Sequence, residues 1–236
     1  MTFPSPPIIL VGMKRSEINT LIESSIRFFE EMWFKLPKWG YWSPAEWEGK
    51  REVALEIVEN MLGWDLTDFG KNDFRKRGLI LFTLRNGSLL KDKKPYAEKI
   101  MIVGENQETP MHFHWSKMED IINRGGGNLV IELNGSTGDE ELSDGEVRVK
   151  IDGIARTVPA GGRVILAPGE SICLVQGLYH RFFGEPGKGR VLVGEVSAVN
   201  DDLKDNRFYE KQGRFPEIEE DVEPEYLLVT DYEKWV

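Results

Sequence analysis

Residues 111–120 read Met-His-Phe-His-Trp-Ser-Lys-Met-Glu-Asp and hold two of the three histidines in the chain. His112 and His114 are two residues apart, so in a β-strand both imidazoles point to the same face. Glu119 follows five residues after His114, far enough for the chain to turn and return a carboxylate to that face. The third histidine, His180, lies in another strand-like segment. Three imidazoles and one carboxylate form a ligand set for Mn²⁺, Fe²⁺, Co²⁺, Ni²⁺ or Zn²⁺ that leaves coordination positions open for a substrate.

The chain on both sides of this stretch, over residues 78–197, has a hydrophobic period of two. Short runs rich in Val, Ile, Leu and Phe are separated by turn dipeptides such as Asn86-Gly87, Asn134-Gly135 and Asp152-Gly153. The runs cover residues 79–84, 96–103, 128–133, 147–151, 164–166, 171–175 and 190–197. Short strands at regular spacing, with no long helix between them, predict an antiparallel sandwich or barrel.

The chain up to about Gly70 has a helical period. Apolar residues recur at three- and four-residue steps from Ile18 to Met32, with Ser16 as the expected N-cap. Ser43-Pro44-Ala45-Glu46 predicts a second helix start, and a third apolar stripe stops at Gly63. We expect one domain over residues 1–236: a helical N-terminal extension (1–77) packed outside, a barrel (78–198), and a C-terminal lid segment with a final strand at 226–230 (199–236).

Composition excludes several classes of protein. The chain has 236 residues, with 30 Lys and Arg against 40 Asp and Glu, so the net charge is −10. An acidic chain lacks the basic surface that nucleic acids require. No run approaches the ~18 consecutive apolar residues of a membrane span. Cys173 is the only cysteine and cannot form an intrachain disulfide, which predicts a cytoplasmic protein.

The residues around the histidines resemble the two motifs of the cupin superfamily. The first motif is matched by Gly104, His112-Phe113-His114, Glu119 and Gly126, although Gly104 lies two residues farther from the first histidine than in the common form. The second is matched by Gly177-Leu178-Tyr179-His180, with Val175 where a proline is usual. The resemblance implies an all-β core, a cupin barrel (a double-stranded β-helix or jelly roll).

Longer stretches are similar to the D-lyxose isomerase family. They are Met111–Asp120, Arg124–Asn128, Gly177–Arg181, Gly194–Ser197, Asn200–Asp202, Asp205–Phe208 and Arg214–Asp221, and the likeness runs from Met13 over most of the chain. This resemblance implies a divalent metal, typically Mn²⁺, and interconversion of D-lyxose with D-xylulose and of D-mannose with D-fructose. The expected partner is a small sugar, and a homodimer is the prior for a cupin.

Isomerising a 2-hydroxy aldehyde requires moving a proton from C2 to C1 through a cis-enediol, and a carboxylate can be the base. Glu195 is one candidate, because alternation with Val193 sends it to the interior face of its strand. Glu217 is the other, in the segment Arg214-Phe215-Pro216-Glu217 that could cover the barrel mouth. Lys117 lies between two ligand residues, so we expect its ammonium near the metal, where it stabilises oxyanion charge; the alternative is a solvated lysine on a turn.

Asp205 and Arg207 are candidates to bind sugar hydroxyls, with an ion pair between them as the alternative. Two other functions use the same ligands: a metal-dependent cupin dioxygenase, and a sugar-binding cupin without catalysis. A dioxygenase is expected to have an apolar mouth, whereas the charged residues named above suit a polyol. The isomerase is therefore the favoured interpretation.

Overall fold

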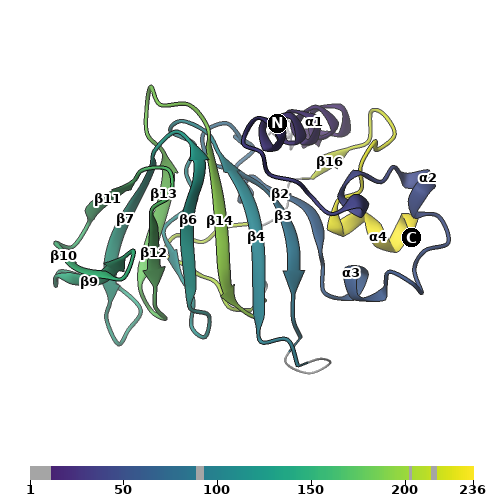
Figure 1. The fold of residues 1–236 in the computed structure, drawn as a ribbon. Helices are drawn as coiled ribbons and strands as arrows, with labels where there is room; N and C mark the ends of the chain where they lie inside the picture. Colours follow the sequence, from purple (N-terminus) through teal and green to yellow (C-terminus); the bar gives the residue numbers. More distant parts are fainter. Residues whose placement is uncertain (1–11, 89–92, 202–203, 214–216) are drawn as a thin grey trace, which may run out of the picture.

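The computed structural model describes residues 12–88, 93–201, 204–213 and 217–236, and two large sheets enclose its core (Figure 1). The larger sheet has eight strands in the order β10-β9-β12-β6-β14-β4-β3-β2. Their bounds are β2 (Gly63–Thr67), β3 (Leu79–Asn86), β4 (Tyr96–Val103), β6 (Glu119–Gly126), β9 (Val147–Ile151), β10 (Ile154–Val158), β12 (Ser171–Leu174) and β14 (Val191–Ala198).

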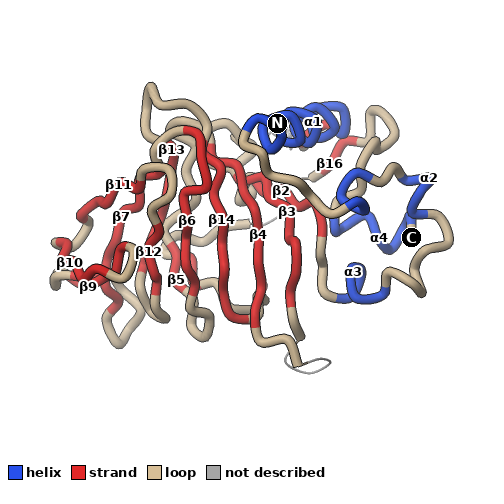
Figure 2. Tube along the Cα trace, in the orientation of Figure 1, coloured by secondary structure: helices blue, strands red, loops and turns tan. Residues whose placement is uncertain are grey.

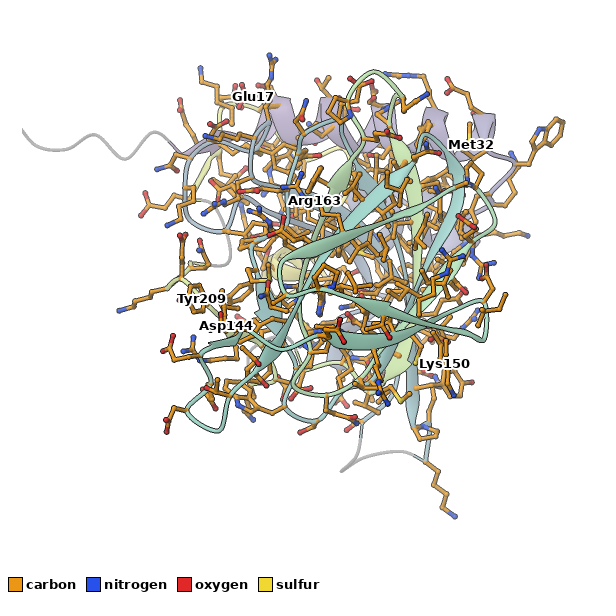
Figure 3. The ribbon with its side chains drawn as sticks, turned by 90° about the vertical axis from the view of Figure 1, so that its left-hand side faces the viewer. Glu17, Met32, Asp144, Lys150, Arg163 and Tyr209 are labelled. Carbon is orange, nitrogen blue, oxygen red and sulfur yellow. The ribbon has the colours of Figure 1, made fainter. Side chains whose placement is uncertain are left out.

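The smaller sheet has the order β11-β7-β13-β5-β15, with β8 (Leu142–Ser143) paired to β7. Its other strands are β5 (His112–Phe113), β7 (Leu129–Ser136), β11 (Gly162–Leu166), β13 (Tyr179–Gly184) and β15 (Arg207–Phe208). Figure 3 turns the molecule so that the β9–β11 end faces the viewer, with Lys150 of β9 and Arg163 of β11 labelled. Strand pairs within both sheets are antiparallel, as the short runs and turn dipeptides predict.

Both faces of β3 and β4 are buried over most of their length. In β3, Leu79 and Leu81 point into the core between the sheets, while Ile80 and Phe82 point to the outer side. There they pack against α1 (Arg15–Glu31), which Figure 2 shows among the helices gathered on the side of the molecule that carries β2 and β3. Burial of both faces explains why β3 reads as a continuous apolar run rather than an alternating one.

The helix starts agree with the sequence in part. Ser43 begins α2 (Pro44–Trp47) as predicted, and its backbone N–H donates to the Glu46 carboxylate at 2.9 Å. The first helix begins one residue before the expected cap, with Lys14 as N-cap. Ser16 lies inside the helix instead, where its hydroxyl donates to Asp221 at 2.7 Å, and this bond links the helix to the C-terminal segment.

One strand was not predicted, and one predicted element is wrong. Residues 63–67, just past the predicted end of the helical stripe at Gly63, form strand β2 after α3 (Leu55–Glu59). They pair with β3, and Trp64 and Leu66 fill the layer under α1. The stretch 226–230 is not a strand: Leu228 alone makes a bridge, to Trp64. It is followed by a 3-10 helix, η2 (Val229–Asp231), and by α4 (Tyr232–Trp235). The Tyr232 hydroxyl donates to the carbonyl of Leu62 at 2.6 Å, which holds this turn against the start of β2.

The C-terminal segment is tied to the first helix by a buried ion cluster. Arg15 is 1% exposed, and its guanidinium lies 2.7 Å from Glu220 and 2.9 Å from Asp231. Glu220 follows β16 (Ile218–Glu219), which pairs in parallel with β1 (Met13–Lys14). In the described part of the chain, we find no helix that is both long and apolar enough to cross a bilayer.

Candidate active site and metal centre

A cavity of about 290 Å³ opens between the sheets. One part of its wall is charged and comes from β4, β5, β6 and β14, together with the loop that joins β5 to β6. Another part comes from β2, the loop after it and the segment after β15. The polar lining residues are Asp65, Thr67, Lys99, Thr109, His112, His114, Lys117, Glu119, Glu195, Asn206 and Gln212.

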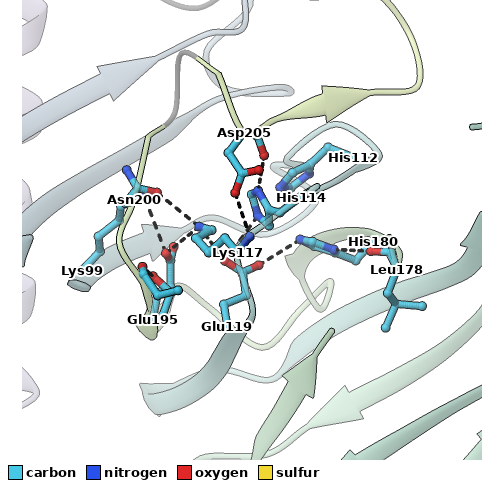
Figure 4. A network of polar contacts seen from close by, with 12 residues as sticks. Lys99, His112, His114, Lys117, Glu119, Leu178, His180, Glu195, Asn200 and Asp205 are labelled. Atoms are coloured by element: carbon cyan, nitrogen blue, oxygen red, sulfur yellow. Dashed lines mark hydrogen bonds and ion pairs between the residues drawn. The ribbon is translucent and has the colours of Figure 1, made fainter. Parts of the chain in front are cut away.

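The three histidines converge beside this cavity (Figure 4). His112 of β5 is directly opposite His180 of β13 in the ladder, and His114 follows β5 on the same face. One ring nitrogen from each histidine lies within 4.8 Å of the other two. Glu119, the first residue of β6, places one carboxylate oxygen 3.1 Å from His180 Nε2 and the other 3.4 Å from His114 Nε2. The structure therefore brings together all four predicted ligands.

Backbone carbonyls set the tautomer of each ring. A carbonyl only accepts, so a ring nitrogen bonded to it carries the hydrogen, and the other nitrogen of a neutral imidazole presents a lone pair. The Nδ1 atoms bond to the carbonyls of Pro110 for His112 (2.8 Å), of Asp205 for His114 (2.9 Å) and of Leu178 for His180 (2.9 Å). Metal-binding histidines are oriented in this way.

The surroundings of His180 Nε2 indicate whether a cation fits between the ligands. It is buried and has no hydrogen-bond partner in the described part of the chain, and a Glu119 oxygen is its neighbour at 3.1 Å. A lone pair and a carboxylate at this distance repel each other unless a positive charge lies between them. The donor set of three imidazoles and one carboxylate thus fits a divalent metal ion.

The charge states agree with this donor set. Burial holds the pKa of His112 well below its usual range, and the neighbouring His180 and His114 lower it further, so the ring is neutral. Burial alone would raise the pKa of Glu119, but the Lys117 ammonium holds it well below the usual range. Neutral imidazoles and an ionised carboxylate are the forms that bind metal.

A chain of alternating charges extends from the ligands (Figure 4). The ammonium of Lys117 is 2.8 Å from Glu119 Oε2 and 2.8 Å from Glu195 Oε1. Lys99 of β4 lies 3.5 Å from the same Glu195 oxygen, and its ammonium donates to the side chain of Asn200 at 2.7 Å. The side chains of Lys117, Glu195 and Lys99 are at most 6% exposed, which is costly unless each charge is paired. Lys117 is therefore a buried partner of a ligand rather than a solvated lysine.

Asp205 and Arg207 lie outside the cavity lining. The Asp205 carboxylate accepts the backbone N–H groups of Ser116 and Lys117, both at 2.8 Å, so it shapes the loop between the ligands. Arg207 donates to Glu140 at 2.8 Å instead of pairing with Asp205. The residue between them, Asn206, is the one that lines the cavity.

Glu217 is not brought to the ligands. Its side chain is exposed and is absent from the described cavity lining, and its carbonyl accepts the Met13 N–H at 2.8 Å beside the β1–β16 pair. The residues that precede it in the predicted lid, Arg214, Phe215 and Pro216, lie outside the described residues.

Sequence reasoning missed several polar residues of the cavity. Lys99 could have been found, because it precedes Met101 by two residues in a clear strand pattern and so shares its inward face. Asp65 and Thr67 lie just past the end of the helical stripe at Gly63, where no strand was predicted, and only a strand sends alternate residues inward. Gln212 follows a short strand in a coil-rich segment, where no period predicts its direction.

Comparison with solved structures shows the fold. The chain superposes on the structure of Cellulomonas parahominis L-ribose isomerase that contains L-ribose, and the TM-score is 0.60. The two are 14% identical, and the match covers 89% of this chain and 100% of that chain. L-ribose isomerase of Geodermatophilus obscurus gives a TM-score of 0.57 with 14% identity, covering 88% and 99%. The predicted all-β cupin barrel with N-terminal helices outside is confirmed.

Comparison of sequences shows the family. The model of the family described as D-lyxose isomerase matches residues 13–232. The D-lyxose/D-mannose isomerase of Serratia proteamaculans is 50% identical over 95% of this chain and 100% of its own length. That of Escherichia coli O157:H7 is 49% identical over 94% of this chain and 100% of its own length. With its converging histidines and a charged cavity beside them, the chain belongs to the D-lyxose isomerase family.

Proposed function

We propose that this protein is an aldose–ketose isomerase that interconverts D-lyxose with D-xylulose and D-mannose with D-fructose. One observation carries the proposal: a buried carboxylate, Glu195, and a buried ammonium, Lys117, line the same cavity as three of the four proposed metal ligands, His112, His114 and Glu119. Isomerisation needs a base and a group that stabilises oxyanion charge at one place. The two curated relatives act as D-lyxose/D-mannose isomerases by name and match almost the whole chain, which supports this choice of sugars.

His112, His114, Glu119 and His180 are the residues proposed to hold the metal, with Mn²⁺ as the resident ion and Co²⁺, Ni²⁺, Fe²⁺ or Zn²⁺ as ions that suit the same donors. When bound, the ion supplies Lewis acidity at the C1 and C2 oxygens of the sugar. Asp205 supports the ligands from outside the cavity: its carbonyl orients His114 and its carboxylate holds the loop that carries Lys117.

In the proposed reaction, the Glu195 carboxylate takes the proton from C2 and returns it to C1, on the same face of a cis-enediol. Lys117 donates to the sugar oxygen on which negative charge develops, and the hydroxyl proton leaves O2 while O1 gains one, so that C2 becomes the carbonyl and C1 the hydroxymethyl group. Because the Lys117 ammonium also contacts Glu119 and Glu195, it holds the base at a fixed place beside the ligands. Glu217 is exposed at β16 and is therefore assigned no role in proton transfer.

The test uses metal-free protein reloaded with Mn²⁺ and assayed on D-lyxose, D-mannose and D-xylose, with ketose and O₂ measured together. We expect ketose from the first two sugars without O₂ uptake. Uptake of O₂ with no ketose would support a dioxygenase instead. Sugar binding without turnover would support a non-catalytic cupin.

We also propose a cytoplasmic homodimer. The single cysteine, Cys173, is free and half-buried, which suits a reducing compartment. Closed two-fold pairs are the commonest assembly of soluble homo-oligomers. Sedimentation equilibrium of the full chain distinguishes a dimer from a monomer of 27.0 kDa.

A further inference from the structure

Gln212 has an unusual position in the cavity wall. It lines the cavity that contains the ligands, yet it comes from the segment after β15 rather than from a long strand. Both polar atoms of its side-chain amide are buried, and neither has a hydrogen-bond partner among the described residues. Of the residues that line this cavity, Gln212 is the one whose buried amide is left without a partner in the described part of the chain.

The backbone around Gln212 is held in place by contacts with the loop after β2. The N–H of Gly213 donates to the carbonyl of Phe69 at 3.0 Å. Gly70 has a φ of +70°, and a Cβ added to it would lie 2.9 Å from the Cα of Gly213, so only glycine permits this approach. Phe69 and Phe208 pack edge to face with ring centroids 6.0 Å apart. The amide is therefore held at the wall by a packed backbone rather than by bonds of its own.

A buried amide without partners is destabilising by about 1–3 kcal/mol, so such a group in a native protein needs a partner, such as a water, an ion or a ligand. At the wall of a substrate cavity, a bound sugar can be that partner. The Gln212 amide offers both donors and an acceptor, and a sugar hydroxyl can donate and accept at once. At the other part of the wall, the metal ligands, Lys117 and Glu195 take the C1–C2 end of the substrate. That leaves the hydroxyls at C3 and C4, whose configuration D-lyxose and D-mannose share, for a residue such as Gln212.

We infer that Gln212 is a specificity-determining residue that hydrogen-bonds the C3 or C4 hydroxyl common to both sugars. The inference rests on the proposed isomerase function. A pocket built to bond a hydroxyl rejects an analogue that lacks it, because the protein group is then left buried and unpaired.

The test compares the Mn²⁺-loaded wild type with Gln212→Leu, which keeps roughly the volume and removes the amide. Each protein is assayed with D-mannose, 3-deoxy-D-mannose and 4-deoxy-D-mannose. We expect kcat/KM of the variant on D-mannose to fall about 10- to 100-fold. The wild type should prefer D-mannose over one deoxy analogue by a similar factor, and the variant should lose that preference.

Melting of the sugar-free proteins provides the second readout. Because the variant lacks an unpaired buried amide, we expect its midpoint to equal or exceed that of the wild type, while the upward shift caused by D-mannose becomes smaller. A lowered midpoint in the sugar-free variant, or an unchanged preference for D-mannose over both analogues, overturns the inference. If the wild type itself forms no ketose, the proposed function fails. If the wild type is active and the variant behaves identically, only the inference about Gln212 fails.

Discussion

Strands β3, β4 and β14 of the larger sheet have an apolar outer face and an inner face that combines apolar with charged side chains. On β4, Lys99 and Met101 face the cavity, whereas Ile100 and Ile102 face α1. On β14, Glu195 faces the cavity and Leu192 faces outward. Over these strands the outer face is apolar and packs against α1, while the inner face also buries lysine and glutamate side chains beside the histidines.

Residues on the outer face should therefore matter for the stability of the fold, and charged residues on the inner face for catalysis. Apolar groups on the outer face stabilise the fold by leaving water. Charged groups on the inner face lose their hydration, so they persist only because they pair with one another and with the ligand set. Since the two kinds of residue alternate along one strand, substitutions at neighbouring positions should affect different measurements.

The largest effect should come from the ligand set. His180→Ala removes an imidazole and leaves a cavity that cannot complete the metal shell. We expect bound Mn²⁺ to be lost and turnover to fall at least about 10³-fold, the scale of removing one strong electrostatic contribution. Metal content by mass spectrometry and ketose formation check this. Retention of stoichiometric metal with full turnover would rule out the assigned ligand.

The base should come next. Glu195→Gln keeps the shape of the side chain but removes its ability to take a proton, so kcat should fall about 10²- to 10⁴-fold while metal content is unchanged. The matched variant Glu217→Gln changes an exposed carboxylate at β16 and should retain kcat within about twofold, since exposed sites tolerate such changes. The reverse result, with loss only in the second variant, would transfer the role to Glu217.

The outer face should respond in stability rather than in turnover. Phe82 is fully buried between Trp39 and Trp64, so Phe82→Ala should lower the free energy of unfolding by about 3–5 kcal/mol. Urea denaturation measures the change, and kcat of the folded variant should be preserved. Val53→Ala at an 85% exposed position is the control and should lie within about 0.5 kcal/mol of the wild type. A large loss of kcat in folded Phe82→Ala would contradict the expectation that outer-face residues affect stability but not turnover.

Asp205 holds the loop that carries Lys117, so its substitution tests whether this loop positions the metal ligands. Asp205→Ala removes the carboxylate that accepts two N–H groups of the ligand loop but keeps the carbonyl that orients His114. We expect the affinity for Mn²⁺ to weaken about 10- to 100-fold, the usual cost of losing an outer partner of metal ligands. Metal titration measures this, and unchanged affinity together with a raised KM would point to direct sugar binding instead.

The smallest effect concerns the attachment of α1 over the outer face. The bonds that Glu220 accepts from Arg15 lower the pKa of that carboxyl below its ordinary value of 4.5. Because the pKa is lower in the folded state, the ionised carboxylate stabilises the fold above pH 4.5. This stabilisation is lost as the pH falls through the lower pKa of the folded state. Because Glu220 is half-exposed, Glu220→Gln should lower the free energy of unfolding by about 1 kcal/mol or less at pH 7. The difference from the wild type should vanish in strong acid, as urea denaturation over pH can verify.

The patterns that carried the prediction were local. The H-x-H spacing, with a strand period of two, placed His112 and His114 on one face, and the same alternation sent Glu195 inward with Val193. The patterns failed where tertiary contacts override the period. The edge strand at residues 63–67 was not predicted and forms where β3 offers a partner. The strand predicted at residues 226–230 is replaced by a turn and short helices that Tyr232 ties to Leu62 across the fold.

By itself, the sequence determined the class of fold, the ligand types and the inward face of each regular strand, because these depend on the periods of two and 3.6 residues and on side-chain chemistry. Only the tertiary structure decided which irregular segments reach the cavity. Asn206 and Gln212 line the cavity, whereas Asp205 and Arg207, the two neighbours of Asn206 in sequence, do not. In a segment without a repeating hydrogen-bond pattern, side-chain direction depends on contacts with distant residues, and here the close approach of Gly70 and Gly213 sets it.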